Sequence, residues 1–267
     1  MPTVQAVPLL PWDGADSFGV SVAVTTRLGG VSRPPYDTLN LGLHVGDLPE
    51  HVLANRARAA HSFGASLDEL VFAHQVHGTT VGHVGPAEAG RGATSEDHAL
   101  ADTDVLITTC PDVTLVILVA DCVPIALVDS EARVVAAVHA GWRGTAAAVV
   151  GAAVRAMADA GARPERVRAF VGPAVAPSRY QVHDEVRNAL AAATRPSPLA
   201  SHVAQPDGSG RWRVDLVAAN RQQLEAAGLA PEHIVESGIT TANPSLFSDR
   251  AARPCGRFGL LARLAAR

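Results

Sequence analysis

The sequence predicts a mixed α/β fold built around a sheet that is covered on both faces. Four β-branched and nearly continuous apolar segments follow one another closely, at residues 104–109, 114–120, 124–129 and 134–139. Strands without polar residues at alternate positions are typical of sheets that are buried on both sides. An alanine-rich helix is predicted directly after them, at residues 145–161.

The first part of the chain shows strand, loop and helix signals in turn. Residues 18–27 alternate apolar and small polar side chains, which is typical of a strand. A loop rich in glycine and proline follows, and residues 49–63 then form a predicted helix that Gly64 ends. Two further strands are predicted at residues 71–77 and 79–84.

Shorter elements are predicted after the central strands. We expect strands at 167–171 and 212–214, helices at 184–193 and 216–227, a loop at 197–210, and a last strand or short helix at 260–264.

Composition limits the classes of function. The chain has 267 residues, of which 48% are apolar and 18% charged, and no linker divides it, so we expect a single domain over residues 1–267. The net charge of -4 gives no electrostatic reason to expect nucleic acid or an anionic membrane as partner. All 22 basic residues are arginine, which excludes lysine Schiff bases and Walker-type phosphate loops.

Several features of the sequence favour a cytoplasmic location. The amino terminus lacks the basic start and apolar core of a secretion signal, and apolar runs such as 113–120 are too short to cross a bilayer. Cys110, Cys122 and Cys255 show no disulfide-framework spacing. We therefore expect a reducing compartment.

One thiol and two imidazoles stand at predicted strand ends. Cys122 and His139 lie at opposite ends of two strands joined by a turn, so both can point at one spot. His77 closes another apolar strand just before a glycine. A zinc ion with three protein ligands and one open position needs such a set, so we predict that His77, Cys122 and His139 are zinc ligands and form the catalytic centre.

Other interpretations of these residues remain open at this level. Cys122 alone can be a small buried apolar residue, or the nucleophile of a cysteine hydrolase with His139 as base. Two histidines and a cysteine are also the ligands of blue copper, but the usual axial methionine is missing near these motifs. A zinc-stabilised binding module would need a fourth protein ligand.

Residues beside the predicted ligands have weaker sequence signals. Arg143 lies between two glycines at the start of a predicted helix, where backbone N–H groups favour an anion. His74 is placed on the face of its strand opposite to His77, outside the metal set. Asp121 is expected to point away from Cys122, with a minor role as base or as a partner of the ligands.

Motifs across the chain resemble the laccase-domain family, also called YfiH-like or polyphenol-oxidase-like proteins. The most specific are Ala120-Asp121-Cys122 and the motif from His139 to Gly144. The others are Thr25-Thr26-Arg27, Gly29-Gly30-Val31-Ser32, Asn40-Leu41-Gly42, Gly46-Asp47, Asn55-Arg56, Gln75-Val76-His77-Gly78, Gly172-Pro173, Tyr180, Asp215-Leu216 and Gly256-Arg257.

The resemblance implies layered sheets flanked by helices, and zinc at His77, Cys122 and His139. It also implies a purine nucleoside phosphorylase that uses phosphate and accepts adenosine, inosine, guanosine and methylthioadenosine, often with adenosine deaminase activity. Family members have also been described as copper polyphenol oxidases or linked to peptidoglycan editing. On this basis we predict that Arg143 and Arg56 bind phosphate and that Asn40 positions substrate, because arginine matches phosphate oxygens in pairs.

The sequence departs from the family pattern near its end. Thr240-Thr241 stands where relatives usually carry Cys-Thr, and Ser248-Asp249-Arg250-Ala251 stands in place of Ser-Tyr-Arg-Arg. The metal set is unaffected, whereas substrate preference can differ.

Overall fold

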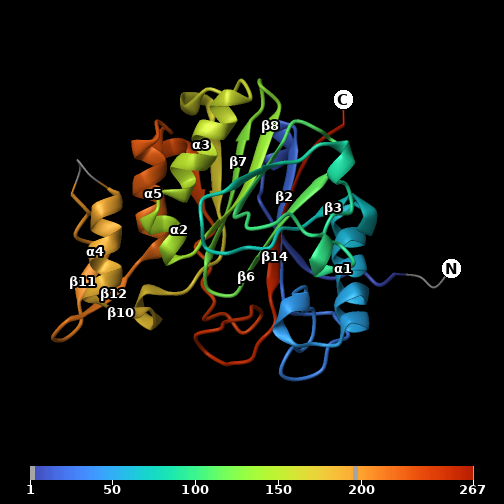
Figure 1. The fold of residues 1–267 in the computed structure, drawn as a ribbon, viewed down its shortest axis with the longest axis horizontal. Coiled ribbons are helices and arrows are strands. Elements are labelled where there is room, and N and C mark those ends of the chain that lie inside the picture. Colours follow the sequence, from blue (N-terminus) through green and yellow to red (C-terminus); the bar gives the residue numbers. More distant parts are fainter. Residues whose placement is uncertain (1–3, 195–197, 267) are drawn as a thin grey trace.

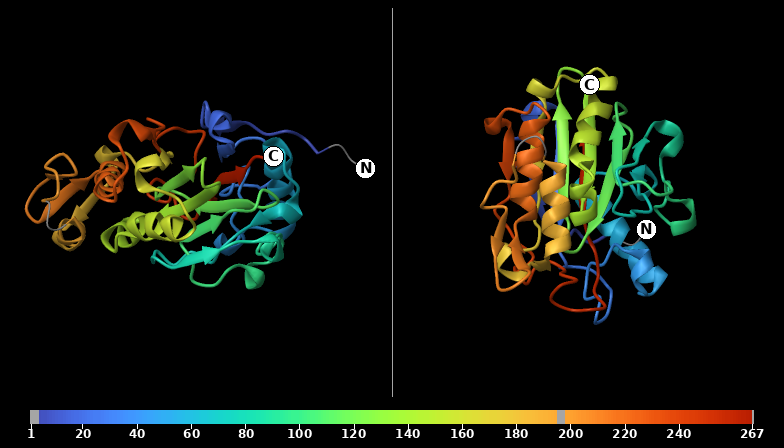
Figure 2. Two further views of the ribbon diagram at one scale, coloured as in Figure 1. Left: turned by 90° about the horizontal axis from the view of Figure 1, so that it is seen from above. Right: turned by 60° about the vertical axis from the view of Figure 1, so that its left-hand side comes forward.

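Two β-sheets packed face to face form the centre of the protein, and helices cover their outer sides (Figure 1). The computed structural model describes residues 4–194 and 198–266. The views in Figure 2 show the layers from above and from the helical side. The mixed α/β fold of layered sheets flanked by helices is therefore confirmed.

The larger sheet contains the run of apolar strands predicted from the sequence. Its order is β13-β9-β7-β8-β5-β4. These strands are Ile234–Glu236 (β13), Arg168–Val171 (β9), Val123–Asp129 (β7), Val134–Ala140 (β8), Val105–Thr108 (β5) and Val81–His83 (β4).

The second sheet pairs segments from both ends of the chain. Its order is β1-β2-β14-β6-β3, formed by Leu9–Pro11 (β1), Val20–Thr25 (β2), Phe258–Leu264 (β14), Thr114–Val119 (β6) and Leu70–Val71 (β3). A small third sheet, β10-β12-β11, is formed by Gln181–His183, Arg211–Val214 and Ala204–Pro206.

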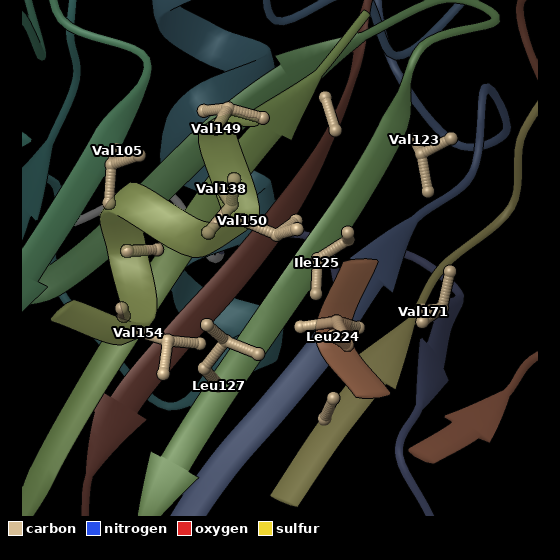
Figure 3. Close-up of a cluster of buried hydrophobic side chains, with 14 of the residues drawn as sticks. Val105, Val123, Ile125, Leu127, Val138, Val149, Val150, Val154, Val171 and Leu224 are labelled. Carbon is tan, nitrogen blue, oxygen red and sulfur yellow. The ribbon is translucent and has the colours of Figure 1, made fainter. Parts of the chain in front are cut away.

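Strand β7 shows why its sequence is apolar at every position. Ile125 and Leu127 face the helices, whereas Ala126 and Val128 face the second sheet. Because neighbouring side chains on a strand point to opposite faces, a sheet between two layers needs apolar residues throughout. Figure 3 shows the cluster on the helical side.

Helices complete both outer layers. Val149–Asp159 (α3) and Leu216–Ala226 (α5) pack on the outer face of the six-stranded sheet, and Pro49–Phe63 (α1) packs on the other sheet. The remaining α-helices are Trp142–Ala146 (α2) and Asp184–Ala193 (α4). Short 3-10 helices lie at Ala15–Phe18, Leu43–Val45, Leu67–Glu69, Pro86–Glu88, Glu96–His98, Pro164–Arg166, Pro177–Arg179 and Pro231–His233.

Three predicted segments differ in the structure, and the short strands β1, β10 and β13 were not predicted. Residues 72–80 are mostly irregular rather than two long strands, because His77 has a left-handed φ of 62°. The predicted helix at 145–161 begins earlier, at Trp142, and is interrupted at Ala148, whose φ is 59°. The predicted loop at 197–210 contains β11, and its residue 197 lies outside the described part of the chain.

Candidate metal centre and its cavity

Three side chains from separate parts of the chain converge at one end of the six-stranded sheet. They are His77, Cys122 and His139, and their potential ligand atoms all lie within 4.8 Å of one another. Cys122 Sγ lies 3.7 Å from His77 Nε2, and the two imidazole rings meet edge to face with centroids 4.7 Å apart. The structure therefore brings together all three residues predicted as metal ligands.

Strand pairing places two of these residues side by side. In the antiparallel pair of β7 and β8, Val123 lies opposite Ala140 and Pro124 lies opposite His139. Cys122 directly precedes β7, so its thiol emerges beside the end of β8. The two predicted strands joined by a turn are confirmed.

Asp104 organises the other parts of the cluster. This fully buried carboxylate accepts hydrogen bonds from the backbone N–H groups of Val76, His77 and Gly78, at 3.2, 2.9 and 2.7 Å. Its Oδ1 also lies 2.7 Å from His139 Nδ1. A carboxylate on one imidazole nitrogen fixes the ring and leaves the other nitrogen, Nε2, for a metal.

Asp104 was missed in the sequence because it directly precedes a buried strand and was counted as its first residue. Burial opposes its ionisation, but hydrogen bonds from His139 and from the Gly78 amide outweigh this and lower its pKa. It therefore carries the negative charge that complements His139.

The electrostatics of the cluster favour a thiolate. Burial raises the pKa of the Cys122 thiol, but the nearby charge of His139 and hydrogen bonds with both histidines outweigh burial and lower it. Burial acts against protonation of His139, whereas the Cys122 thiolate and Asp104 raise its pKa. A thiolate is the form of cysteine that binds metals and attacks electrophiles.

The donor set fits zinc. Ligands about 2.0–2.3 Å from a tetrahedral zinc ion lie roughly 3.3–3.8 Å apart. Cys122 Sγ and His77 Nε2 meet this at 3.7 Å, and all three ligand atoms lie within 4.8 Å of one another. Within the described residues no fourth histidine, cysteine or carboxylate joins the group, as an open catalytic position requires. Met157 belongs to α3 and its side chain packs in the hydrophobic core, so it cannot act as the axial ligand of blue copper.

A cavity of about 540 Å³ opens beside the cluster. Four arginines line it: Arg143, Arg250, Arg253 and Arg257. Acidic and aromatic residues also line it: Glu96, Asp121, Asp249, Trp142 and Tyr180. The cavity is suited to an anionic ligand or to a neutral ligand together with an anion.

Of the residues predicted to bind phosphate, only Arg143 lines this cavity. Its guanidinium lies 4.4 Å from the centroid of the Trp142 ring, at the first turn of α2. Among the described residues it has no carboxylate within ion-pair distance. Arg143 is thus free to bind an anion.

Arg56 lies outside the cavity and has a structural environment. It is 3% exposed, and its guanidinium donates to the carbonyl oxygens of Leu41, Gly92 and Ala93. The same group stacks on the Phe72 ring at 3.8 Å. Because its Nε and Nη1 donate inside the protein and the residue does not line the cavity, we withdraw its assignment to phosphate.

Asn40 is also buried and does not line the cavity, but it acts on a residue that does. Its Oδ1 accepts hydrogen bonds from the backbone N–H groups of Gly42 and Arg257, at 2.9 and 2.8 Å. Its Nδ2 donates to Asp47 at 2.9 Å. Asn40 therefore holds the backbone at Arg257 instead of contacting a substrate in the cavity directly.

His74 lies outside the metal cluster, as predicted, but it lines the cavity together with His77, so the two side chains do not point to opposite faces. The prediction failed because the chain is not extended between them. His74 Nδ1 lies 3.3 Å from Asp102 Oδ1, and both side chains are more than half exposed. Of this pair, only His74 lines the cavity.

Arg250, Arg253 and Arg257 were not assigned a role from the sequence. They occur in one short C-terminal segment whose density of arginine was the available signal. Arg250 Nη2 donates to the Gln181 carbonyl at 2.6 Å, and Asp249 pairs with Arg253 at 2.5 Å and with Arg257 at 3.6 Å.

Known proteins resemble this chain over nearly its whole length. A family model described as multi-copper polyphenol oxidoreductase laccase matches residues 21–265. A protein of Mycobacterium tuberculosis named purine nucleoside phosphorylase is 40% identical over 251 residues, covering 92% of this chain and 94% of the relative. A purine nucleoside phosphorylase of Deinococcus radiodurans is 38% identical over 255 residues, covering 96% and 92%.

Solved structures show the same fold. The hypothetical protein YfiH of Bacillus licheniformis superposes with a TM-score of 0.91 at 33% identity and covers 98% of each chain. YlmD of Geobacillus stearothermophilus superposes with a TM-score of 0.88 at 35% identity and covers 93% of each chain. In the part of our chain that the structure describes, no helix has both the length and the apolar character needed to span a bilayer.

Proposed function

Because the chain belongs to the multi-copper polyphenol oxidoreductase laccase family and its relatives are named purine nucleoside phosphorylases, we propose that it is a zinc-dependent purine nucleoside phosphorylase. Its substrates would be phosphate and adenosine, inosine, guanosine or methylthioadenosine, with adenosine deaminase as a side activity. The observation that carries this proposal is the position of the His77, Cys122 and His139 cluster at the edge of an arginine-lined cavity.

The arginines are assigned to phosphate. In phosphorolysis a phosphate oxygen forms a bond to the sugar C1′ while the bond from C1′ to the purine nitrogen breaks. Positive charge develops on the sugar, so a phosphate anion fixed nearby both stabilises the transition state and attacks. Arg143 and Arg250 line the cavity, and arginine can present paired N–H donors to phosphate oxygens. Arg257 also lines it, but its Nη1 already donates to the carbonyl oxygens of Cys255 and Gly256.

Tyr180 is assigned to the departing base. It lines the cavity, and its ring lies 5.8 Å from the Arg250 guanidinium carbon. Burial and the nearby charge of Cys122 raise its pKa to about 12, so its hydroxyl stays protonated at neutral pH. A neutral O–H donor can stabilise the negative charge that develops on the leaving purine.

The resident metal would be held by His77, Cys122 and His139, with Asp104 fixing the ring of His139. Zinc bound in this way supplies a Lewis acid or lowers the pKa of a bound water to about 7, and the second capability suits deamination. Delivery of phosphate or of water to the same cavity would then decide between the two reactions.

A cysteine hydrolase, such as a peptidoglycan-editing amidase, is the second candidate function. The observation that favours it is the order of contacts from Cys122 through His139 to Asp104, which resembles a nucleophile, a base and an orienting carboxylate. In that reaction Cys122 Sγ would attack a carbonyl carbon and His139 would protonate the leaving amine.

The test is to incubate metal-analysed protein with adenosine, with and without phosphate, and to identify the products. Release of adenine with ribose 1-phosphate, only when phosphate is present, supports the phosphorylase; formation of inosine reports deamination. Cys122→Ala should lose both bound zinc and phosphate-dependent release of base. Turnover that persists without metal but stops on thiol alkylation would refute the zinc-dependent mechanism and favour the hydrolase.

A further inference from the structure

The Asp121 carboxylate accepts hydrogen bonds from residues far away in the sequence. Asp121 lies between β6 and β7, directly before Cys122, and is only 9% exposed. It accepts hydrogen bonds from Thr241 Oγ1 at 2.5 Å, Ser248 Oγ at 2.7 Å and the Arg250 backbone N–H at 2.6 Å. These donors lie 120 to 129 residues downstream.

The backbone at Asp121 is fixed as well. Its φ of 93° lies in the left-handed region, which is uncommon for a residue other than glycine and needs support from its surroundings. Its carbonyl oxygen accepts a hydrogen bond from the Val175 N–H, and the Thr241 N–H donates to Ala174. The turn before Cys122 and residues 174–175 and 241 thus form one connected unit.

The carboxylate is occupied by the protein itself, which argues against a role as a catalytic base. Oδ1 accepts two hydroxyl groups and Oδ2 accepts an amide. Hydrogen bonds to an ionised carboxylate are roughly twice as strong as those between neutral groups. Asp121 therefore acts on the segment that donates to it.

That segment carries the cationic wall of the cavity. Residues 248–257 include Arg250, Arg253 and Arg257. The segment is held near its beginning by Asp121 and at its end by Asn40, which accepts from the Arg257 N–H. The direct bond from the Arg250 backbone to Asp121 sets where the Arg250 side chain begins.

We propose that Asp121 is a positioning residue for phosphate, which holds the Arg250 backbone so that its guanidinium is presented to the cavity beside Cys122. This inference rests on the proposed phosphorylase function. It links the turn that supplies a metal ligand to the segment that supplies the anion-binding arginines.

Two variants of the zinc-loaded protein test the proposal. Asp121→Gly removes the carboxylate at a φ that glycine adopts freely, and should raise the KM for phosphate about tenfold or more. Asp121→Asn removes the charge but keeps one acceptor oxygen, which can still accept from the Arg250 N–H, and should raise the phosphate KM by roughly threefold. In both we expect kcat at saturating phosphate, the KM for nucleoside and the zinc content to stay within twofold of wild type.

A double variant shows whether Asp121 acts through Arg250. In an Arg250→Ala background, adding Asp121→Gly should change the phosphate KM less than twofold, because the affected side chain is already absent. Asp129→Asn, the same kind of substitution at the opposite end of β7, is the matched control and should leave the phosphate KM within twofold. Amide hydrogen exchange over residues 241–251 should become faster in Asp121→Gly and stay unchanged in Asp129→Asn.

The outcomes separate the possible failures. A wild-type phosphorylase in which Asp121→Gly leaves the phosphate KM within twofold refutes the positioning role alone. A fall in kcat with unchanged phosphate KM and unchanged hydrogen exchange would instead make Asp121 a direct participant. A wild-type protein that releases no base on addition of phosphate refutes the proposed function, and the role of Asp121 with it.

Discussion

Gly141 offers a way to disturb the metal centre without removing any ligand. It precedes α2 with φ of -74° and ψ of 171°, a conformation that alanine also adopts, so the backbone permits Gly141→Ala. A Cβ atom at this position would lie 2.5 Å from His77 Cδ2 and 3.0 Å from Cys122 Sγ. Since carbon atoms pack at about 3.5–4.0 Å, the His77 ring would have to move by about 1 Å.

His77 cannot easily follow such a shift. The amides of Val76, His77 and Gly78 are all bonded to the buried Asp104 carboxylate, so the backbone beneath the ring is fixed. Metal–ligand distances tolerate about 0.2 Å, well below the required movement. Loss of outer hydrogen-bond partners alone typically weakens metal binding 10- to 100-fold. We therefore expect Gly141→Ala to lower zinc affinity about 100-fold, or about 2.7 kcal/mol.

The assay is a zinc titration in competition with a chromophoric chelator. Gly151→Ala in α3 is the matched control, because its Cβ would meet only the mobile end of Arg155, at 3.3 Å, apart from an ordinary contact at 4.0 Å. The control should keep wild-type zinc affinity and gain roughly 0.5–1 kcal/mol of stability from the better helix former. Wild-type zinc affinity in Gly141→Ala would show that the metal is not held between His77 and Cys122.

Four further variants test other parts of the structure. Asp104→Asn should weaken zinc binding about 10- to 100-fold in the same titration, because it loosens the orientation of His139. Tyr180→Phe should reduce kcat for inosine phosphorolysis roughly 100-fold but spare 7-methylguanosine, whose base leaves without needing a proton; an equal loss on both substrates would contradict the donor role. Arg56→Ala should cost about 3 kcal/mol in denaturant unfolding, because it leaves three carbonyl groups without their donor, while the phosphate KM stays unchanged. Asp129→Asn should cost about 2 kcal/mol at pH 7. Burial opposes ionisation of Asp129, but hydrogen bonds from backbone amides and an arginine outweigh burial and lower its pKa. The ionised carboxylate therefore stabilises the folded protein above about pH 4, and this stabilisation is lost as the pH falls through the pKa of the folded state. Unfolding curves of wild type and Asp129→Asn should therefore converge below about pH 4, and a constant difference would contradict this assignment.

The sequence was most informative where local pattern and tertiary structure agree. The helix at Pro49–Phe63 was predicted with its observed bounds, because proline begins it and Gly64 ends it with a left-handed φ of 78°. The central strands lack polar alternation because they are buried on both faces, and they were predicted from their β-branched residues and the turn signals between them. Their antiparallel pairing then brought Cys122 and His139 together, as the turn between them implied.

Prediction failed where a side chain overrides the local pattern. Residues 72–80 resemble a strand in sequence. In the structure the Asp104 carboxylate accepts hydrogen bonds from three successive backbone N–H groups, and His77 has a left-handed conformation. Arg56 matches a motif of the family, yet its guanidinium donates hydrogen bonds to carbonyl groups of neighbouring loops. A motif match identifies a residue that matters without telling whether it contacts substrate or supports the fold.

The cationic wall of the cavity depends on a pairing that no local pattern contains. Strand β14 inserts between β2 and β6, with Phe258 opposite Val119 in an antiparallel register. The residues just before β14 must therefore lie beside those just after β6, which places Arg257 and the segment before it next to Asp121 and Cys122. The metal ligands and Arg143 come from residues 77–143, whereas Arg250 and Arg257 reach the site only when this late strand is docked. The two sides of the cavity are thus built by different parts of the chain, and Asp121 lies where they join.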